Sequence, residues 1–271
     1  MNNRLSIVVV SCDSYKDIVE QYLKYFFLNW KDCEYPVFIA MENETIDNYD
    51  VVSVAAGNDS TWTKKAIEAI RMTDSKYVLL SVDDLYISET VNNTEITKVL
   101  DFIEKENIKY YRIPVFRNTE NNFKLYPGTI NVEMIESNKR YNVSIGTAIW
   151  EKQEILKILG DGKMSAWDLE NYFIKKAEVA EPGYLDGYVA DTRYLLHSVH
   201  MIKSGKWIPT GIKEMKEKGF DIDLCNRSYI SFSDQLKLNK FYSWCSKHFP
   251  TRLRILTKKI MTKMGFKFAS K

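Results

Sequence analysis

The feature that most constrains the fold is the alternation of short, β-branched apolar runs with helical patterns in the first part of the chain. Two stretches, residues 15–30 and 63–72, place apolar side chains three and four positions apart, which predicts helices. Strands are expected at Leu5–Val10, 36–41, 51–55 and Tyr77–Val82. Strands that alternate with helices favour a parallel α/β sheet with right-handed crossovers.

The fourth of these strands ends in two adjacent carboxylates, Asp83 and Asp84. In an open parallel sheet, ligands bind outside the carboxyl ends of the strands, so this pair is expected to face a crevice. Mg²⁺ and Mn²⁺ prefer oxygen ligands and keep positions open for substrate phosphates. The pair therefore indicates either a metal–diphosphate site or a solvated strand end.

The other early strands also end in acidic residues, namely Asp13, Glu42 and Asp59. No G-x-G-x-x-G or G-x-x-x-x-G-K-[ST] pattern accompanies them, which excludes a dinucleotide fingerprint and a P-loop. A nucleotide would then depend on ribose and base contacts, with a metal on its phosphates. Trp62 and Lys65, near the third strand end, either contact such a nucleotide or simply begin the helix, with the lysine solvated.

The second part of the chain contains another acidic cluster, Asp168 and Glu170, beside Trp167. A structural explanation is available, because carboxylates stabilise a helix N-terminus. Asp59 or Ser60 is similarly expected to cap the helix at 63–72. Further helices are expected at 94–106, 151–159 and 169–177, and strands at 109–115 and 141–150, the latter interrupted by Gly146.

The order of these motifs resembles the nucleotide-sugar-dependent glycosyltransferases of the GT-A fold, particularly those of bacterial polysaccharide and lipopolysaccharide synthesis. Residues 6–14 resemble the first strand and nucleotide-contacting turn of that family, and residues 81–84, Ser-Val-Asp-Asp, resemble its D-x-D element. Residues 144–150 resemble its acceptor-side strand, 167–170 its catalytic acidic motif, and 194–207 its closing segment. The resemblance covers about residues 5–208 and implies a mostly parallel, Rossmann-like sheet flanked by helices.

The resemblance also implies roles for individual residues. Asp83 and Asp84, with His200 as a third ligand and His197 as its substitute, would hold Mn²⁺ or Mg²⁺. Asp168 would be the catalytic base of an inverting transfer, with Glu170 as the second candidate, and Asp13 would contact the base or ribose. Ser81 stands where a strict D-x-D has its first acid, so a one-carboxylate or metal-light site is an alternative.

The implied activity is transfer of a sugar from a nucleotide-diphosphate donor to a saccharide or lipid-linked saccharide acceptor. A nucleotidyltransferase is a second hypothesis, although residues 11–14, Ser-Cys-Asp-Ser, lack the Gly-rich basic loop usual in such enzymes. A non-catalytic nucleotide-sugar-binding module of the same fold is a third. The fold alone does not distinguish these three functions, so the choice of a transferase rests on the two acidic clusters.

The C-terminal part, 209–271, is predicted to be a helical extension of the transferase domain at 1–208. Seven basic residues and no acidic one occur in 252–271, which leaves an excess of acidic side chains in the rest of the chain. An amphipathic helix here would either lie on an anionic membrane surface or pack on the domain. The acidic body argues against a nucleic-acid partner.

The four cysteines are scattered, with no C-x-x-C pair, which fits a reducing compartment better than a disulfide scaffold or a zinc site. The N-terminus lacks the basic and long apolar regions of a signal peptide, and no run of about 18 apolar residues suggests a spanning helix. We therefore expect a cytoplasmic protein, or one that is peripheral on the inner face of the cell membrane.

Overall fold

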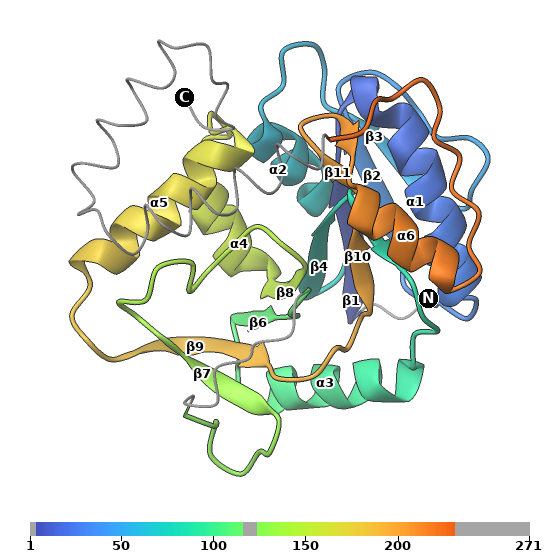
Figure 1. Cartoon of the computed structure of the whole chain (residues 1–271). Coiled ribbons are helices and arrows are strands. Elements are labelled where there is room, and N and C mark those ends of the chain that lie inside the picture. Colours follow the sequence, from blue (N-terminus) through green and yellow to red (C-terminus); the bar gives the residue numbers. More distant parts are fainter. Residues whose placement is uncertain (1–3, 116–123, 231–271) are drawn as a thin grey trace. The chain divides into compact units, whose positions relative to one another are not determined.

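The structure is a computed structural model and describes residues 4–115 and 124–230. The chain divides into two compact units, Met1–His200 and Met201–Lys271, a little before the expected boundary at residue 208 (Figure 1). The basic segment 252–271, on which the membrane prediction depends, lies outside the described residues.

The first unit is built on an eight-stranded sheet with the order β3-β2-β1-β4-β8-β6-β9-β7. Its strands are β1 (Leu5–Val10), β2 (Val37–Met41), β3 (Val52–Ala55), β4 (Tyr77–Val82), β6 (Tyr110–Arg112), β7 (Val132–Glu136), β8 (Ala148–Glu151) and β9 (Tyr184–Asp191). The first four strands are parallel, as predicted. A separate antiparallel pair consists of β5 (Leu85–Ile87) and β10 (Ser198–His200).

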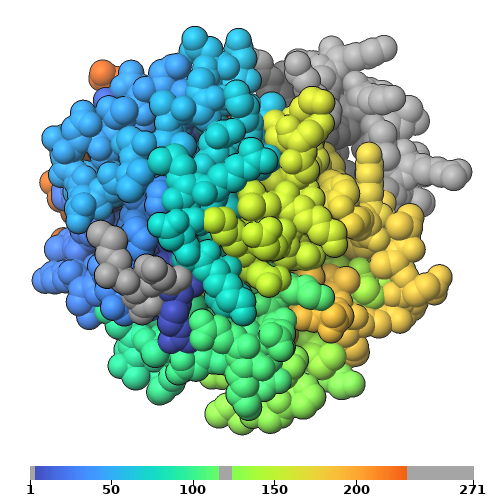
Figure 2. All heavy atoms as spheres, turned by 180° about the vertical axis from the view of Figure 1, so that it is seen from behind, coloured from blue at the N-terminus to red at the C-terminus, as the bar shows by residue number. Residues whose placement is uncertain are grey.

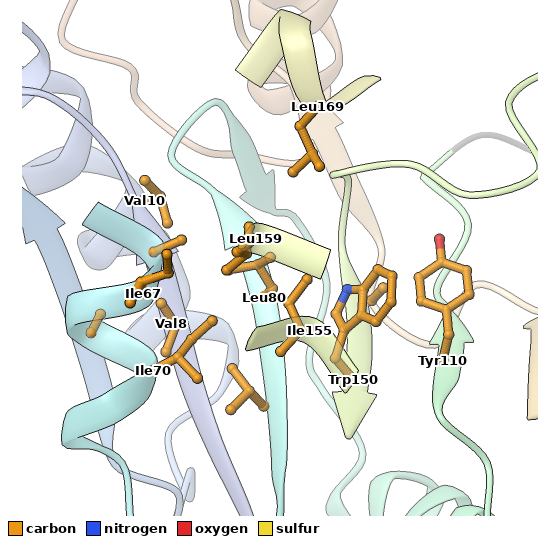
Figure 3. Packing of buried hydrophobic residues seen from close by; sticks show 14 of the residues in the cluster. Val8, Val10, Ile67, Ile70, Leu80, Tyr110, Trp150, Ile155, Leu159 and Leu169 are labelled. Atoms are coloured by element: carbon orange, nitrogen blue, oxygen red, sulfur yellow. The ribbon is translucent and has the colours of Figure 1, made fainter. Parts of the chain in front are cut away.

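The helices of this unit cover both faces of the sheet. They are α1 (Lys16–Asn29), α2 (Trp62–Met72), α3 (Asn93–Lys105), α4 (Lys152–Leu159) and α5 (Ala166–Val179), with a short 3₁₀ turn η1 (Asp13–Tyr15). Side chains of α2, α4 and α5 share one core cluster with alternate residues of β1 and β4, such as Val8 and Leu80 (Figure 3). In Figure 2, which views this face, α2 in cyan lies next to α4 in yellow-green.

The opposite face of the sheet packs on α1 and α3. The Tyr77 hydroxyl of β4 donates to the Ile103 carbonyl of α3, and the Tyr86 hydroxyl of β5 donates to the Ile18 carbonyl of α1. All six residues of β1 are buried and all but Ser6 are apolar, as expected of a strand that is covered on both faces. The expected α/β fold with helices on both faces is confirmed.

Two strand predictions in the second half were wrong in extent. The predicted strand at 109–115 is only β6, and the predicted strand at 141–150 is only β8, which runs antiparallel to β4 and β6. Residues 141–147 precede β8 outside the sheet, and side chains bond part of their backbone. The Arg112 guanidinium donates to the carbonyls of Tyr141 and Asn142, and Tyr141 has a φ of 59°.

The cap of α2 also differs from the prediction. Thr61 accepts from the Lys64 amide, while Asp59 sits in the preceding turn at a φ of 57° and the Ser60 hydroxyl donates back to Ala56 and Gly57. The other helices lie within a few residues of their predicted positions.

The second unit contains the two-stranded pair β11 (Ile202–Lys203) and β12 (Lys206–Trp207), followed by α6 (Pro209–Glu217). Pro209 opens α6, a position at which proline loses no helical hydrogen bond. The Trp207 indole donates to the Leu224 carbonyl and ties the segment after α6 to the strand pair. No helix within the described ranges is long and apolar enough to cross a membrane.

Candidate functional site

A cavity of about 780 Å³ opens at the carboxyl ends of β1, β4 and β6, entirely within the first unit. The strand order places β2 on one side of β1 and β4 on the other, so the chain leaves β1 in one direction and returns on the opposite side. Val10 of β1 is level with Ala40 of β2 and Val82 of β4, and the residues that follow these strands therefore meet at one edge. This is the switch point at which open α/β sheets bind ligands.

Asp83 lines this cavity and is only 6% exposed. The Ser11 hydroxyl, at the end of β1, donates to its Oδ2. Burial, together with the neighbouring Asp84 charge, raises the pKa of Asp83 to about 7.

Asp84 pairs with His200, also as a wall of the cavity. The His200 Nε2 and Asp84 Oδ2 atoms lie 3.1 Å apart, because β10 pairs with β5 in a register that sets His200 opposite Leu85. His197 does not line the cavity. Its Nδ1 faces Glu89 at 3.4 Å and its ring stacks on Tyr194.

Asp83, Asp84 and His200 are the side chains of the predicted metal site. Within the described part of the chain, no three His, Cys, Asp or Glu side chains are close enough together to hold a metal ion. Asp84 and His200 form a two-ligand set, which fits Mg²⁺ or Mn²⁺ when substrate phosphates and waters complete the coordination. Asp83 is turned to Ser11, so we leave it out of the proposed ligand set.

The two candidate bases have different surroundings. Asp168 closes a capping box at the start of α5: its Oδ2 accepts from the Ser165 hydroxyl and amide, and these bonds lower its pKa. Glu170 lines the cavity and is half-buried, and its desolvation raises its pKa. The Ile145 amide donates to Glu170 Oε1 at 3.3 Å. The structure therefore favours Glu170 over Asp168 as the group that meets a ligand.

The predicted nucleotide contacts are only partly brought together. Asp13, Glu42 and Asp59 do not line the cavity. Asp13 accepts from the amides of Asn43 and Glu44, and Glu42 accepts from the Asp13 amide, so both carboxylates fasten strand ends to each other. Trp62 and Lys65, by contrast, are walls of the cavity.

Both basic side chains on the described walls of the cavity are already paired. Lys65 is 5% exposed and its ammonium donates to Glu42. Arg112 donates to Glu133 at 3.1 Å. Glu170 has no basic partner among the described residues and Asp84 faces only His200, so a diphosphate would meet an acidic cavity unless a cation accompanied it.

Sequence reasoning missed Arg112 and did not use Trp167 as a ligand contact. Trp167 lines the cavity mouth with 53% of its surface exposed, three residues before Glu170 on α5. The i, i+3 spacing indicates that Glu170 lies on the same face of α5 as Trp167. The Ser-x-x-Asp pattern at 165–168 indicates that Asp168 belongs to a capping box. Nothing near Arg112 in the sequence indicates that it turns towards 141–142.

No protein-family model matches the sequence, and no curated protein matches it. Among solved structures, TarS 1–349 from S. aureus in complex with UDP-GlcNAc is similar, with 17% identity, a TM-score of 0.44 and coverage of 69% of this chain and 58% of TarS. The 2-C-methyl-D-erythritol 4-phosphate cytidylyltransferase from Thermus thermophilus has 11% identity, a TM-score of 0.43 and coverage of 79% and 98%.

A nucleotidyl transferase from Methanothermobacter thermautotroptrophicus has 11% identity, a TM-score of 0.40 and coverage of 71% and 89%. The chain spans about three fifths of the TarS 1–349 chains that it matches. At such TM-scores, these likenesses are too distant to assign an activity to this chain.

Proposed function

We propose that the 780 Å³ cavity, the larger of the two cavities that we describe, binds a nucleotide-diphosphate sugar. The protein would transfer the sugar to a hydroxyl of a saccharide or lipid-linked saccharide acceptor. The observation that carries the proposal is the convergence of Asp84, His200 and Glu170 on one cavity at the switch point of the sheet. These residues come from the end of β4, from β10 and from α5, so only the fold brings them together.

The charge balance of the cavity supports metal-assisted binding of the diphosphate. Lys65 and Arg112 are neutralised by Glu42 and Glu133, which leaves no unpaired basic side chain on the described walls. Asp84 and His200 would hold Mn²⁺ or Mg²⁺. When bound, the ion supplies Lewis-acid stabilisation of the negative charge that develops on the leaving diphosphate.

Glu170 is the proposed general base. Desolvation raises its pKa, which makes it a better proton acceptor than an exposed carboxylate. The acceptor oxygen forms a bond to the anomeric carbon of the donor. The bond from that carbon to the diphosphate oxygen breaks, and its electron pair leaves with the diphosphate. The proton of the acceptor hydroxyl passes to Glu170. A single displacement of this kind inverts the anomeric centre.

Nucleotidyl transfer is less well supported, because the turn after β1 carries Asp13 and no basic side chain, and the basic walls are paired. A non-catalytic nucleotide-sugar-binding module has one observation in its favour: the protein ligands for a metal are only two among the described residues, with Asp83 turned to Ser11. Release of nucleoside diphosphate from the donor separates an enzyme from such a module.

The first test is thermal stabilisation by UDP-, GDP-, CMP- and dTDP-sugars, each with and without Mn²⁺, because a ligand that binds the folded state must raise its stability. We expect one nucleotide to stabilise the wild type only with metal, and Asp84→Ala to remove that shift. Asp74→Ala is the matched control, since Asp74 is exposed and lies before β4, at the end away from the cavity. A shift that is unchanged in Asp84→Ala, or absent with every nucleotide, would contradict the proposal.

A further inference from the structure

A second cavity of about 420 Å³ lies between α4, α5 and β9, again within the first unit. It shares no lining residue with the larger cavity. Helix α5 serves both: Trp167 and Glu170, near its start, face the larger cavity, whereas Tyr172 and Lys176, farther along, line the second one. The volume falls in the range of about 300–1,000 Å³ that is usual for small-molecule sites.

The inner wall of the second cavity is aromatic. Phe173 and Tyr188 line it, and both rings pack on the buried Trp150, with centroid distances of 6.5 and 6.1 Å. Tyr172 stands edge-on to Phe173 at 5.6 Å. These rings belong to the sheet core on one side, so they form a rigid surface on the other, against which the apolar face of a ring can pack.

A polar pair interrupts this aromatic wall. The Tyr188 hydroxyl donates to Glu154 Oε1 at 2.5 Å, and burial raises the pKa of Tyr188, which keeps its proton in place. Glu154 Oε2 accepts no hydrogen bond from any described residue. The pair therefore offers acceptor oxygens that suit the hydroxyl donors of a ligand.

Two lysines are also part of the lining of the second cavity. Lys157 of α4 and Lys176 of α5 line it, and neither ammonium has a carboxylate partner among the described residues. Lys176 lies 4.8 Å from the ring centroid of Tyr172. Asp186, the second carboxylate of the lining, is engaged with Lys109 at 2.9 Å. Two ammonium groups thus stand without a carboxylate, among the described residues, above an aromatic wall.

We propose that the second cavity binds a sugar unit that carries an acidic group, either a carboxylate or a phosphate. The apolar face of the sugar ring packs on Tyr172 and Tyr188, its hydroxyls donate to Glu154, and its acidic group lies between Lys157 and Lys176. A neutral sugar leaves both ammonium groups without a partner. A bare anion leaves the aromatic wall and Glu154 without one.

The test is a titration of the isotopically labelled full-length protein, without nucleotide, with glucuronate, glucose 6-phosphate, glucose and UMP. We expect saturable amide shifts confined to residues 154–158 and 172–188, with an acidic sugar binding more tightly than glucose. The double variant Lys157→Gln/Lys176→Gln should weaken its affinity by about two- to thirtyfold, the effect of two exposed ion pairs. The preference between glucuronate and glucose 6-phosphate identifies the acidic group.

Lys175→Gln is the matched control, because Lys175 is exposed on the same helix but does not line the cavity, and it should bind as the wild type does. Ala180→Trp, which fills the cavity at the end of α5, should abolish the shifts at 154–158 in a folded protein. Equal binding of glucose, tighter binding of UMP, or shifts confined to the larger cavity would each overturn the assignment. The outcome is independent of sugar transfer, since no nucleotide or turnover enters the measurement.

Discussion

The buried carboxyl of Asp83 should make the stability of the first unit depend on pH. Its side chain is 6% exposed, and burial beside Asp84 raises its pKa from 3.8 to about 7. Between these values the unfolded chain releases a proton that the folded protein retains, so the free energy of unfolding falls as pH rises. A shift of roughly three units at 1.36 kcal/mol per unit corresponds to a loss of about 4 kcal/mol, complete above pH 7.

Asp83→Asn should remove most of this dependence, because an amide neither ionises nor repels Asp84 and its oxygen still accepts from the Ser11 hydroxyl. The variant should be less affected than the wild type by a rise from pH 5 to pH 8, and more stable than the wild type at pH 8. Denaturant unfolding of both proteins at pH 5, 6, 7 and 8 measures the difference. Asp74→Asn, at an exposed position, is the control and should retain the wild-type slope.

A parallel pH dependence in wild type and Asp83→Asn would refute the reasoning. It would mean that the folded protein ionises Asp83 as readily as the unfolded chain does, through water or a local opening that relieves its burial. A partial effect in Asp84→Asn is also expected, since the Asp84 charge is the second cause of the raised pKa.

Three further outcomes follow from the structure. In a turnover assay, Glu170→Gln should reduce kcat by about 10²–10⁴-fold as a lost general base, whereas Asp168→Asn should change it far less; equal losses would contradict the assignment. Ser165→Ala removes the cap of α5 and should lower the free energy of unfolding by about 0.5–2 kcal/mol in denaturant titrations, and an unchanged value would mean that the cap is redundant. Gly162→Ala should cost about 1–3 kcal/mol in the same assay, because φ is 74° and the new Cβ would lie 3.2 Å from Lys64 Cα; a neutral result would show that this turn relaxes freely.

The parallel half of the sheet was predictable because its signals are local. Leu5–Val10 and Tyr77–Val82 are apolar at nearly every position, as strands covered on both faces must be. The same reasoning predicted that Asp83 and Asp84 lie at the carboxyl ends of the parallel strands. Strand ends could be read because each run stops at polar residues.

The antiparallel half was harder, because its backbone is satisfied by distant side chains. Residues 141–147 contain enough apolar residues to suggest a strand, yet Arg112 takes the carbonyls of Tyr141 and Asn142. The sequence shows neither the partner of a carbonyl nor the positive φ of Tyr141. Strand propensity is therefore overridden by one guanidinium some 30 positions away.

The candidate site divides in the same way. Neighbouring residues alone indicate that acidic groups follow the strands and that an acidic motif opens α5. Which of them face the cavity depends on packing between distant elements: Asp13, Glu42 and Asp168 bond to turns and a cap, whereas Asp84, Glu170 and His200 line one cavity. The physical reason is that a carboxylate takes whichever donors the fold brings within about 3 Å, and those donors are set by strand register and helix placement.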